Sequence, residues 1–309
     1  MKNIQIKMSL IFTIVCISFN VYAQENIKGF AFLRIGTGGR AAGMGEAYTA
    51  AASGAEATFW NPALMSSENN NSVVLAHTEW LEDIRIEFLG FSFSKGKLNF
   101  GISINSNTVS DIEKRSNPVV TPEGYFSAGD FFVGLSASYK LKENLKIGIT
   151  GKYLYQKIYI EEASGYAFDL GAGYDMPGIN LKLGAVVKNI GSVNALKDEK
   201  TPLPSLFRIG AVYMMPDLSE NISLLFSTDV EKLFDSSISS LFDYFTYHGL
   251  EAAYKEKMFL RAGYQSGFEA RGISFGLGVK IKKYNFDYGF QPFSFQMGST
   301  HRLSFLYNF

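Results

Sequence analysis

The chain has 309 residues, of which 47% are hydrophobic, 15% aromatic and 19% charged. Its 29 basic and 29 acidic side chains give a formal net charge of zero, so the composition predicts no electrostatic surface for nucleic acid. Cys16 is the single cysteine and lies near the N-terminus, which excludes a disulfide framework and a thiolate metal site.

The first 23 residues have the pattern of a secretory signal peptide. Lys2 and Lys7 precede an apolar stretch at residues 10–19, and small residues ending at Ala23 follow it. The stretch is shorter than the roughly 20 residues of a membrane-spanning helix, so we predict cleavage after Ala23 and export. An uncleaved membrane anchor is the alternative. No later apolar run is long enough for a helical span, which leaves a periplasmic β-protein or an outer-membrane barrel.

Residues 29–65 differ in character from everything that follows them. This stretch is dense in glycine and alanine and shows no alternation of apolar and polar residues. From residue 72 onwards the sequence becomes a series of alternating segments separated by turns. We therefore predict a signal peptide at residues 1–23, an N-terminal plug at 24–71 and a transmembrane β-barrel at 72–309.

The alternating segments predict about fourteen antiparallel strands. In the stretch 98–105, for example, Leu98, Phe100 and Ile102 alternate with polar or small residues, which places the two sets on opposite faces of a strand. We predict strands near 72–80, 84–94, 98–108, 128–140, 145–157, 165–175, 179–190, 205–215, 221–231, 247–255, 257–266, 271–281, 284–293 and 300–309. Segments of about 9–11 residues suit a tilted strand that crosses a membrane, and closing the sheet removes its edges. A soluble sandwich, whose strands are mostly shorter, is the alternative.

The connections between these strands alternate in length. The joins at 95–97, 141–144, 176–178, 216–220, 255–257 and 282–283 are tight, whereas those at 109–127, 191–204 and 232–246 are long. Outer-membrane barrels have short periplasmic turns and longer extracellular loops, so this asymmetry predicts the orientation. Aromatic residues near the predicted strand ends agree with a membrane interface.

The final strand resembles the C-terminal signal by which outer-membrane barrels are recognised for insertion. Leu303, Phe305, Tyr307 and Phe309 fall on one face of it, and the chain ends on an aromatic residue. The barrel assembly machinery is therefore an expected partner.

No arrangement of catalytic residues is apparent. The three histidines, His77, His248 and His301, lie on separate strands without metal-site spacing, and we expect them in the lumen or at an interface. The glycines at 39–45 do not have the order of a nucleotide-binding loop, and no Lys-Ser or Lys-Thr follows them. We predict no enzyme activity, no metal and no cofactor.

Charged residues of the plug require partners inside a lumen. For Arg40, Glu46 and Glu56 we expect an inward-facing lattice of ion pairs that fastens the plug. The candidate partners on the strands are Lys152, Asp169, Lys182, Lys188, Arg208, Asp229, Arg261, Lys280 and Asp287.

The plug resembles the PorV/PorQ family, outer-membrane barrels of FadL-like type that are associated with type IX secretion. The resemblance lies in residues 32–36, 38–47 and 59–63, and the remainder is similar only in its barrel plan. Its motif residues are Gly36, Gly38, Gly39, Arg40, Gly43, Met44, Gly45, Trp60, Asn61 and Pro62.

The resemblance implies a fourteen-stranded barrel with an N-terminal hatch that binds proteins, either as a shuttle for secreted cargo or as an anchor of the secretion machinery. The expected docking surface is the apolar loop that contains Leu233, Phe234, Leu241, Phe242, Tyr244 and Phe245, with capping of the barrel as the alternative. The expected partners are outer-membrane lipid and type IX components or cargo. The alternative function is a FadL-like channel for hydrophobic small molecules such as fatty acids.

Overall fold

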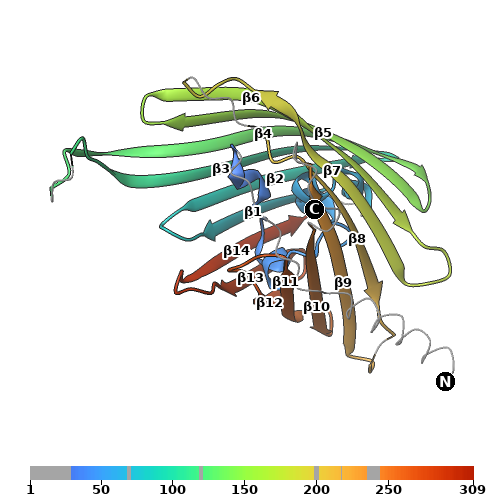
Figure 1. Cartoon of the computed structure of the whole chain (residues 1–309). Coiled ribbons are helices and arrows are strands. Elements are labelled where there is room, and N and C mark those ends of the chain that lie inside the picture. Colours follow the sequence, from blue (N-terminus) through green and yellow to red (C-terminus); the bar gives the residue numbers. More distant parts are fainter. Residues whose placement is uncertain (1–28, 68–70, 118–120, 198–201, 217, 235–243) are drawn as a thin grey trace.

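The computed structural model describes residues 29–67, 71–117, 121–197, 202–216, 218–234 and 244–309. These residues form a closed barrel of fourteen antiparallel strands, in which each strand pairs with its neighbours in sequence and β1 pairs with β14 (Figure 1). The predicted fold class, an all-β barrel of about fourteen strands, is confirmed. The predicted signal peptide lies outside the described residues.

The strand bounds follow the alternating segments of the sequence closely. The strands are β1 (Ser72–Glu79), β2 (Arg85–Lys95), β3 (Leu98–Lys114), β4 (Gly124–Lys142), β5 (Leu145–Ile158), β6 (Glu161–Asp175), β7 (Leu181–Val193), β8 (Leu206–Met214), β9 (Ile222–Leu233), β10 (Phe245–Tyr254), β11 (Met258–Ser266), β12 (Ile273–Ile281), β13 (Tyr284–Pro292) and β14 (Ser299–Asn308).

Alternation puts the apolar side chains on the outside of the barrel. On β3, Leu98, Phe100 and Ile102 are exposed, whereas Asn99 and Ser103 on the opposite face are buried. The other strands repeat this pattern, so large aliphatic and aromatic side chains cover the outer wall. This belt is the surface that a membrane-spanning barrel presents to lipid, while a water-soluble barrel would bury it.

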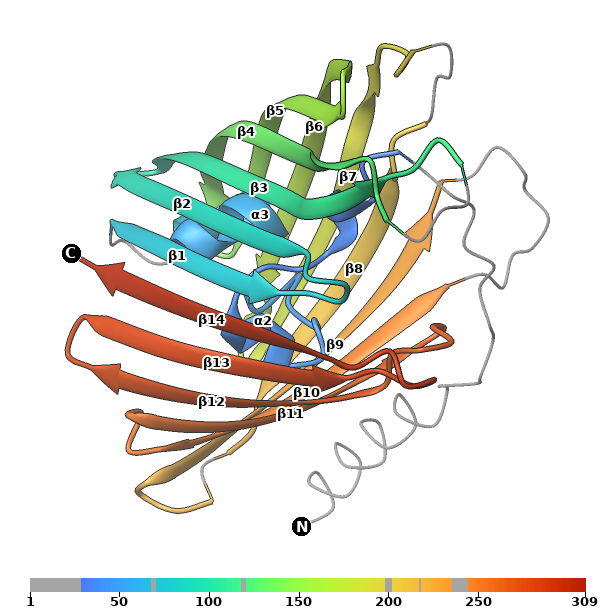
Figure 2. The same cartoon turned by 90° about the vertical axis from the view of Figure 1, so that its left-hand side faces the viewer.

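The two ends of the barrel differ. The turns at 96–97, 143–144, 255–257 and 282–283 lie at one end, which we call the turn end. The joins that follow β1, β3, β5, β7, β9, β11 and β13 lie at the other, the loop end, and most of them are longer, although the join at 159–160 has only two residues. The wall is uneven in height, because β3 and β4 have 17 and 19 residues whereas β1 has 8 (Figure 2). The expected loop at 109–127 is shorter than predicted. Both strands continue into it past a bulge between Val109 and Ile112, because backbone pairing persists beyond the apolar belt.

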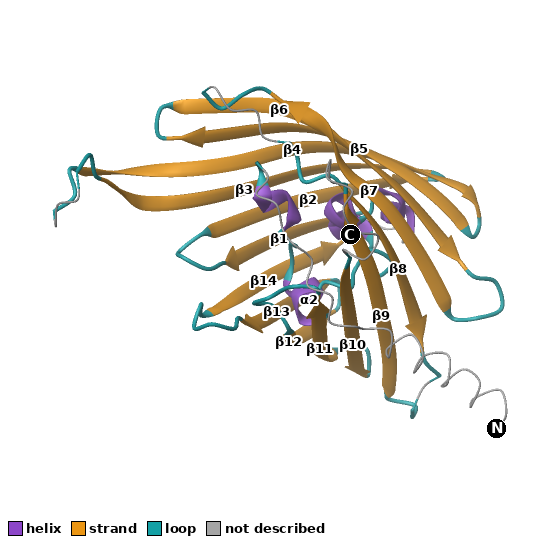
Figure 3. Cartoon of the chain, in the orientation of Figure 1, coloured by secondary structure: helices purple, strands orange, loops and turns teal. Residues whose placement is uncertain are grey.

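Short helices occupy the inside of the barrel (Figure 3). They are η1 (Ala31–Arg34), α2 (Gly39–Gly43), η2 (Gly54–Glu56), α3 (Ala57–Trp60) and η3 (Pro62–Ser67). Helices of three to six residues are not stable alone, so the surrounding wall determines their conformation. Among the described residues, no helix is long and apolar enough to cross a membrane. We refer to residues 29–67 as the plug.

The core of the molecule lies between the plug and the inward-facing side chains. The buried plug residues Phe59, Trp60 and Met65 belong to the same cluster as Phe88 and Phe132 of the wall. The plug supplies the apolar interior that the polar inner faces of the strands do not form by themselves.

Candidate functional site

The contact between the plug and the wall requires glycine on both surfaces. A Cβ atom added to Gly39 would lie 2.5 Å from the carbonyl oxygen of Asp287, and one added to Gly43 would lie 2.7 Å from the Cα of Gly276. Gly289 faces the same helix, where an added Cβ would lie 2.5 Å from that of Ala42. The glycine-rich motif of α2 therefore allows the helix backbone to rest directly on β12 and β13.

One side of this contact is ionic. Arg40 of α2 binds Glu251 of β10 with both ends of its guanidinium, at 2.9 Å from Nε to Oε2 and 2.8 Å from Nη2 to Oε1. Glu251 also accepts from Arg261 at 2.5 Å, and Arg261 reaches Asp287 at 2.7 Å. The charges are thus linked in a chain from the plug to β10, β11 and β13, and each of these charges has an opposite charge beside it.

Two further ion pairs tie the plug to the same side. Glu46 pairs with Arg302 of β14 at 2.6 Å, and Arg302 is fully buried. Arg34 pairs with Glu231 of β9 at 3.1 Å. Arg208 of β8 donates to the backbone carbonyl of Glu46.

The plug backbone is also bound to this side. Asp229 of β9 accepts hydrogen bonds from the amides of Tyr48 and Thr49 at 3.0 and 2.9 Å. Ser227 donates to the carbonyl of Ala47 at 2.7 Å, so the chain between α2 and η2 is held against β9. We call the contacts with β8–β14 the charged side.

The opposite side of the plug is aromatic. The Phe59 ring lies 5.7 Å from that of Phe88 on β2 and 6.4 Å from that of Phe132 on β4. Phe32 of η1 stacks on Phe132 at 6.3 Å, and Trp60 meets Phe59 edge-on at 5.3 Å. We call the contacts with β2–β7 the aromatic side.

Lys188 of β7 is a cation on the aromatic side. Its ammonium lies 4.1 Å from the centre of the Phe59 ring, and its residue is 6% exposed. Within the part of the chain that the structure describes, no carboxylate forms an ion pair with it. Lys152, in contrast, pairs with Asp169 at 2.6 Å. A cation over an aromatic face is stabilised by the ring quadrupole, although less strongly than by a carboxylate.

The Trp-Asn-Pro-Ala segment fastens the far end of the plug. The Asn61 side-chain amide donates to the carbonyl oxygens of Thr49 and of Ala172 on β6, each at 3.1 Å, and its oxygen accepts from the amide of Ala63. Pro62 lies against Gly148 of β5, where an added Cβ would lie 2.4 Å from the Pro62 carbonyl carbon. These contacts hold the Trp-Asn-Pro-Ala segment against β5 and β6.

Glu56 of the plug is a carboxyl without an ion pair in the described residues. It accepts a hydrogen bond from the Tyr48 hydroxyl at 2.8 Å. Burial raises the pKa of Glu56 to about 7; the Arg40 guanidinium opposes the shift, and the Asp287 carboxylate adds to it. Glu56 lines a polar cavity of about 490 Å³ at the turn end, together with Arg40 and Glu251.

The expected ion-pair lattice is present with a partly different membership. Arg208, Asp229, Arg261 and Asp287 contribute to the charged side, whereas Asp169 pairs within the wall and Lys280 is exposed. The plug's direct ionic partners, Glu251, Arg302 and Glu231, were missed, although the apolar neighbours Leu250 and Leu303 could have placed the first two on the inner face.

The predicted docking loop is only partly within the described residues. Leu241 and Phe242 lie outside them. Phe234 is exposed, but Phe245 is 2% exposed and packs on Phe268 at 4.5 Å between ring centres. Phe245 is therefore an inward-facing residue of β10, because the strand begins earlier than the sequence suggested.

The other predicted positions fall on the outer wall. Leu303, Phe305, Tyr307 and Phe309 share the outer face of β14, where Tyr307 and Phe309 stack at 5.5 Å. His77, His248 and His301 also face outwards, which rules out the lumen and leaves the interface, the other position expected for them. No group of metal-binding side chains occurs among the residues that the structure describes.

Comparisons with known proteins agree with this architecture. The sequence model of an uncharacterised protein family (UPF0164) matches residues 17–165. A search of curated proteins finds no match. The fold is similar to that of the Ralstonia pickettii toluene transporter TbuX, with a TM-score of 0.58 and 15% identity over 88% of this chain and 97% of that one.

Two further solved structures share the fold. The Pseudomonas putida toluene transporter TodX matches with a TM-score of 0.59 and 13% identity, over 94% of this chain and 99% of that one. A Pseudomonas aeruginosa FadL homologue matches with a TM-score of 0.51 and 12% identity, over 88% and 98%. The chain thus has the fold of FadL-type barrels.

Proposed function

We propose that this protein is an outer-membrane channel for hydrophobic small molecules that the plug closes in the conformation described. The apolar outer belt supports the membrane location, and the asymmetry of the connections supports an extracellular loop end and a periplasmic turn end. The solved structures of similar fold include proteins named as toluene transporters, which supports a hydrophobic solute.

The observation that carries the proposal is the division of the plug surface into two sides. The ion pairs seen between plug and wall, within the described residues, go to β9, β10 and β14. Towards β2 and β4 the plug presents Phe32 and Phe59 to Phe88 and Phe132. Separation along that boundary exposes aromatic rings and breaks no ion pair, so a hydrophobic solute is the kind of molecule that replaces the lost contacts.

The test is uptake by intact cells. A strain that lacks the gene should take up radiolabelled toluene or a long-chain alkane more slowly than one that carries it. Variant Phe59→Ala should accelerate uptake relative to wild type, while Leu135→Ala, on the outer face of β4, serves as the matched control. Equal uptake with and without the protein, for aromatic and aliphatic solutes alike, would refute the proposal.

A role in type IX secretion is the second candidate. It is supported by the resemblance of residues 30–65 to PorV/PorQ and by the exposed side chain of Phe234 in the predicted docking loop. Affinity purification from detergent-solubilised outer membranes should then recover secretion components or cargo. Recovery of the barrel alone would leave the channel as the supported function.

We also propose that the β14 outer face acts as the signal for the barrel assembly machinery. Phe305 and Tyr307 present aromatic rings along this face, and both pair with β1 in the closed wall. Substitution of Phe309 by Ser should lower the amount of heat-resistant folded barrel in the outer membrane, whereas the same change at Phe100 should leave that amount unchanged.

A further inference from the structure

Asn105 of β3 has a buried carboxamide that makes no hydrogen bond. The residue is 0% exposed, and neither Nδ2 nor Oδ1 has a partner among the described residues. Of the asparagines and glutamines that the structure describes, it is the one in which both polar side-chain atoms are buried and unpaired. An unpaired buried carboxamide lowers stability, so this side chain contributes something other than stability to the protein.

The wall residues on either side of Asn105 are apolar. The backbone register places it between Phe88 of β2 and Phe132 of β4, and the same row continues through Ala76 and Leu154. These four neighbours are buried and belong to the core cluster that includes the plug. A single polar side chain therefore interrupts an apolar row on the aromatic side.

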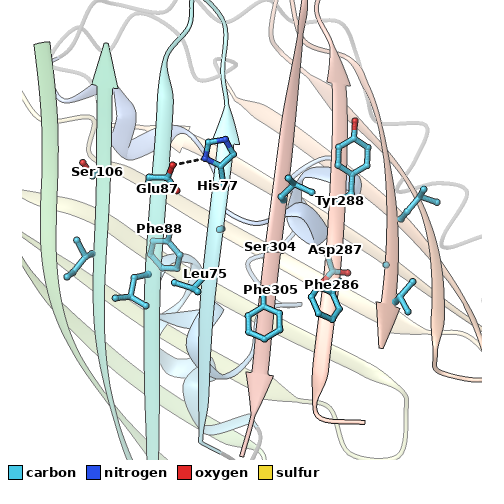
Figure 4. Close-up of a pocket in the computed structure, with 17 residues that line it drawn as sticks. Leu75, His77, Glu87, Phe88, Ser106, Phe286, Asp287, Tyr288, Ser304 and Phe305 are labelled. Carbon is cyan, nitrogen blue, oxygen red and sulfur yellow. Dashed lines mark hydrogen bonds and ion pairs between the residues drawn. The ribbon is translucent and has the colours of Figure 1, made fainter. Parts of the chain in front are cut away.

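The side chain of Asn105 points into the lumen. Ser106, the next residue of β3, lines a groove of about 680 Å³ on the outer wall, together with His77 and Glu87 (Figure 4). Successive residues of a strand point to opposite faces, so Asn105 faces the plug. The outer histidine has a partner, since its Nδ1 lies 2.6 Å from Glu87 Oε1, as the dashed line shows. The inner carboxamide has none.

Phe59 of the plug packs on both neighbours of Asn105. Its ring lies 5.7 Å from that of Phe88 and 6.4 Å from that of Phe132. The same ring lies 4.1 Å from the ammonium of Lys188 on β7. When the plug separates from the aromatic side, Phe59 vacates a ring-sized space. The unpaired carboxamide of Asn105 then borders this space on the β3 side, and the ammonium of Lys188 borders it on the β7 side.

We propose that this space takes a monoaromatic solute with a hydroxyl group, and that Asn105 is the residue that selects it. The hydroxyl donates a hydrogen bond to Oδ1 of Asn105 and accepts one from Nδ2. The ring replaces that of Phe59, so Lys188 keeps an aromatic face beside its ammonium. This proposal deepens the proposed function and rests on it, because it requires the plug to separate at the aromatic side.

Hydrogen bonding and ring chemistry distinguish this class of solute from others. A hydrocarbon has neither donor nor acceptor, so it leaves both atoms of the carboxamide unpaired. An aromatic carboxylate accepts from Nδ2 of Asn105 but has no hydrogen to donate to Oδ1. An alicyclic alcohol pairs with the carboxamide and leaves Lys188 without an aromatic face. A phenol-type solute satisfies both residues.

The experiment is competition for uptake of radiolabelled toluene by intact cells that carry the full-length protein. The competitors are p-cresol, p-xylene, p-toluate and a methylcyclohexanol, of which the first two differ by a hydroxyl in place of a methyl group. With the wild type, p-cresol should compete at a concentration about tenfold lower than p-xylene, and also below the carboxylate and the alicyclic alcohol. Asn105→Leu should remove the preference for p-cresol over p-xylene.

Thermal unfolding in detergent micelles provides a second, independent measurement. Asn105→Leu should raise the midpoint, because an apolar side chain of similar size replaces an unpaired carboxamide. Asn99→Leu is the matched control on the same face of β3, where the carboxamide accepts a hydrogen bond from Ser94. This control should not raise the midpoint and should keep the preference for p-cresol. Heat-modifiability on gels verifies that each variant is folded.

Four results would overturn the proposal. They are competition by p-xylene or the methylcyclohexanol that equals that of p-cresol, strongest competition by p-toluate, an unchanged preference in Asn105→Leu, or a lower midpoint in that variant. Toluene uptake that does not depend on the protein would refute the channel itself and this proposal with it. Failure of selection and failure of transport are therefore distinguished.

Discussion

The two sides of the plug are held by different kinds of interaction. The charged side joins the partly buried Arg40 to Glu251 and the buried Glu46 to Arg302 through short, directional contacts. The aromatic side packs Phe59 against Phe88 and Phe132 at ring separations of 5.7 and 6.4 Å. Ion pairs in a dry interior fix one geometry and leave an uncompensated charge when broken, whereas ring contacts weaken gradually. The charged side therefore holds the plug more firmly, and on the proposed function we expect the plug to separate from the wall at the aromatic side.

The largest expected effect comes from Glu251→Ala. The variant removes the ion-pair partner of Arg40 and leaves Arg261 with Asp287 alone. We expect the free energy of unfolding to fall by about 4 kcal/mol, since a buried charge loses its compensation. Unfolding in detergent micelles, followed by circular dichroism, measures the change. Glu143→Ala should alter nothing, and a loss of similar size in that control would show that the assay does not report on the plug.

On the aromatic side, Phe59→Ala should lower the free energy of unfolding by about 3 kcal/mol, because it removes a large buried side chain. Unlike Glu251→Ala, it should also speed the passage of hydrophobic solutes. The same substitution at Phe100, on the outer face, should do neither. Slower uptake in the Phe59 variant would show that the plug does not separate from the wall at its contact with β2 and β4.

The plug should be held more firmly in acid. The folded-state pKa of Glu56 is raised to about 7 from an ordinary 4.5, so its stabilising contribution is complete below pH 4.5 and is lost as the pH rises through 7. Between pH 5 and pH 8 the difference is about 2 kcal/mol. Protease resistance of the plug should fall over this interval, and Glu56→Gln should flatten the dependence. A wild-type plug that is equally resistant at both pH values would contradict the assignment.

The smallest effect is expected for Ser227→Ala on the charged side. The variant loses one hydrogen bond to the carbonyl of Ala47 and should lower the free energy of unfolding by about 1 kcal/mol. Ser223→Ala, near the turn end of the same strand, provides the comparison. If the two variants unfold alike, backbone tethering by β9 contributes little beside the ion pairs.

The barrel was predictable from the sequence because apolar and polar residues alternate along each strand, with the apolar set on one face and the polar set on the other. The strands from β1 to β14 therefore emerge within a few residues of their true bounds, apart from the extensions of β3 and β4 into the expected loop. The plug was less predictable. Its helices are too short to be encoded by periodicity, and its partners Glu251 and Arg302 are more than 200 residues away in sequence. Their inward position follows from Leu250 and Leu303 beside them, but the choice of plug residue depends on the folded arrangement.

Arg302 has a consequence for the order of assembly. It lies on the strand that seals the cylinder against β1, and its guanidinium is enclosed together with the carboxylate of Glu46. The last strand to close the barrel therefore carries a charge that the first folded segment of the chain neutralises. We expect seam closure and plug seating to be coupled, and a barrel that lacks the plug to be less stable at the β1–β14 seam.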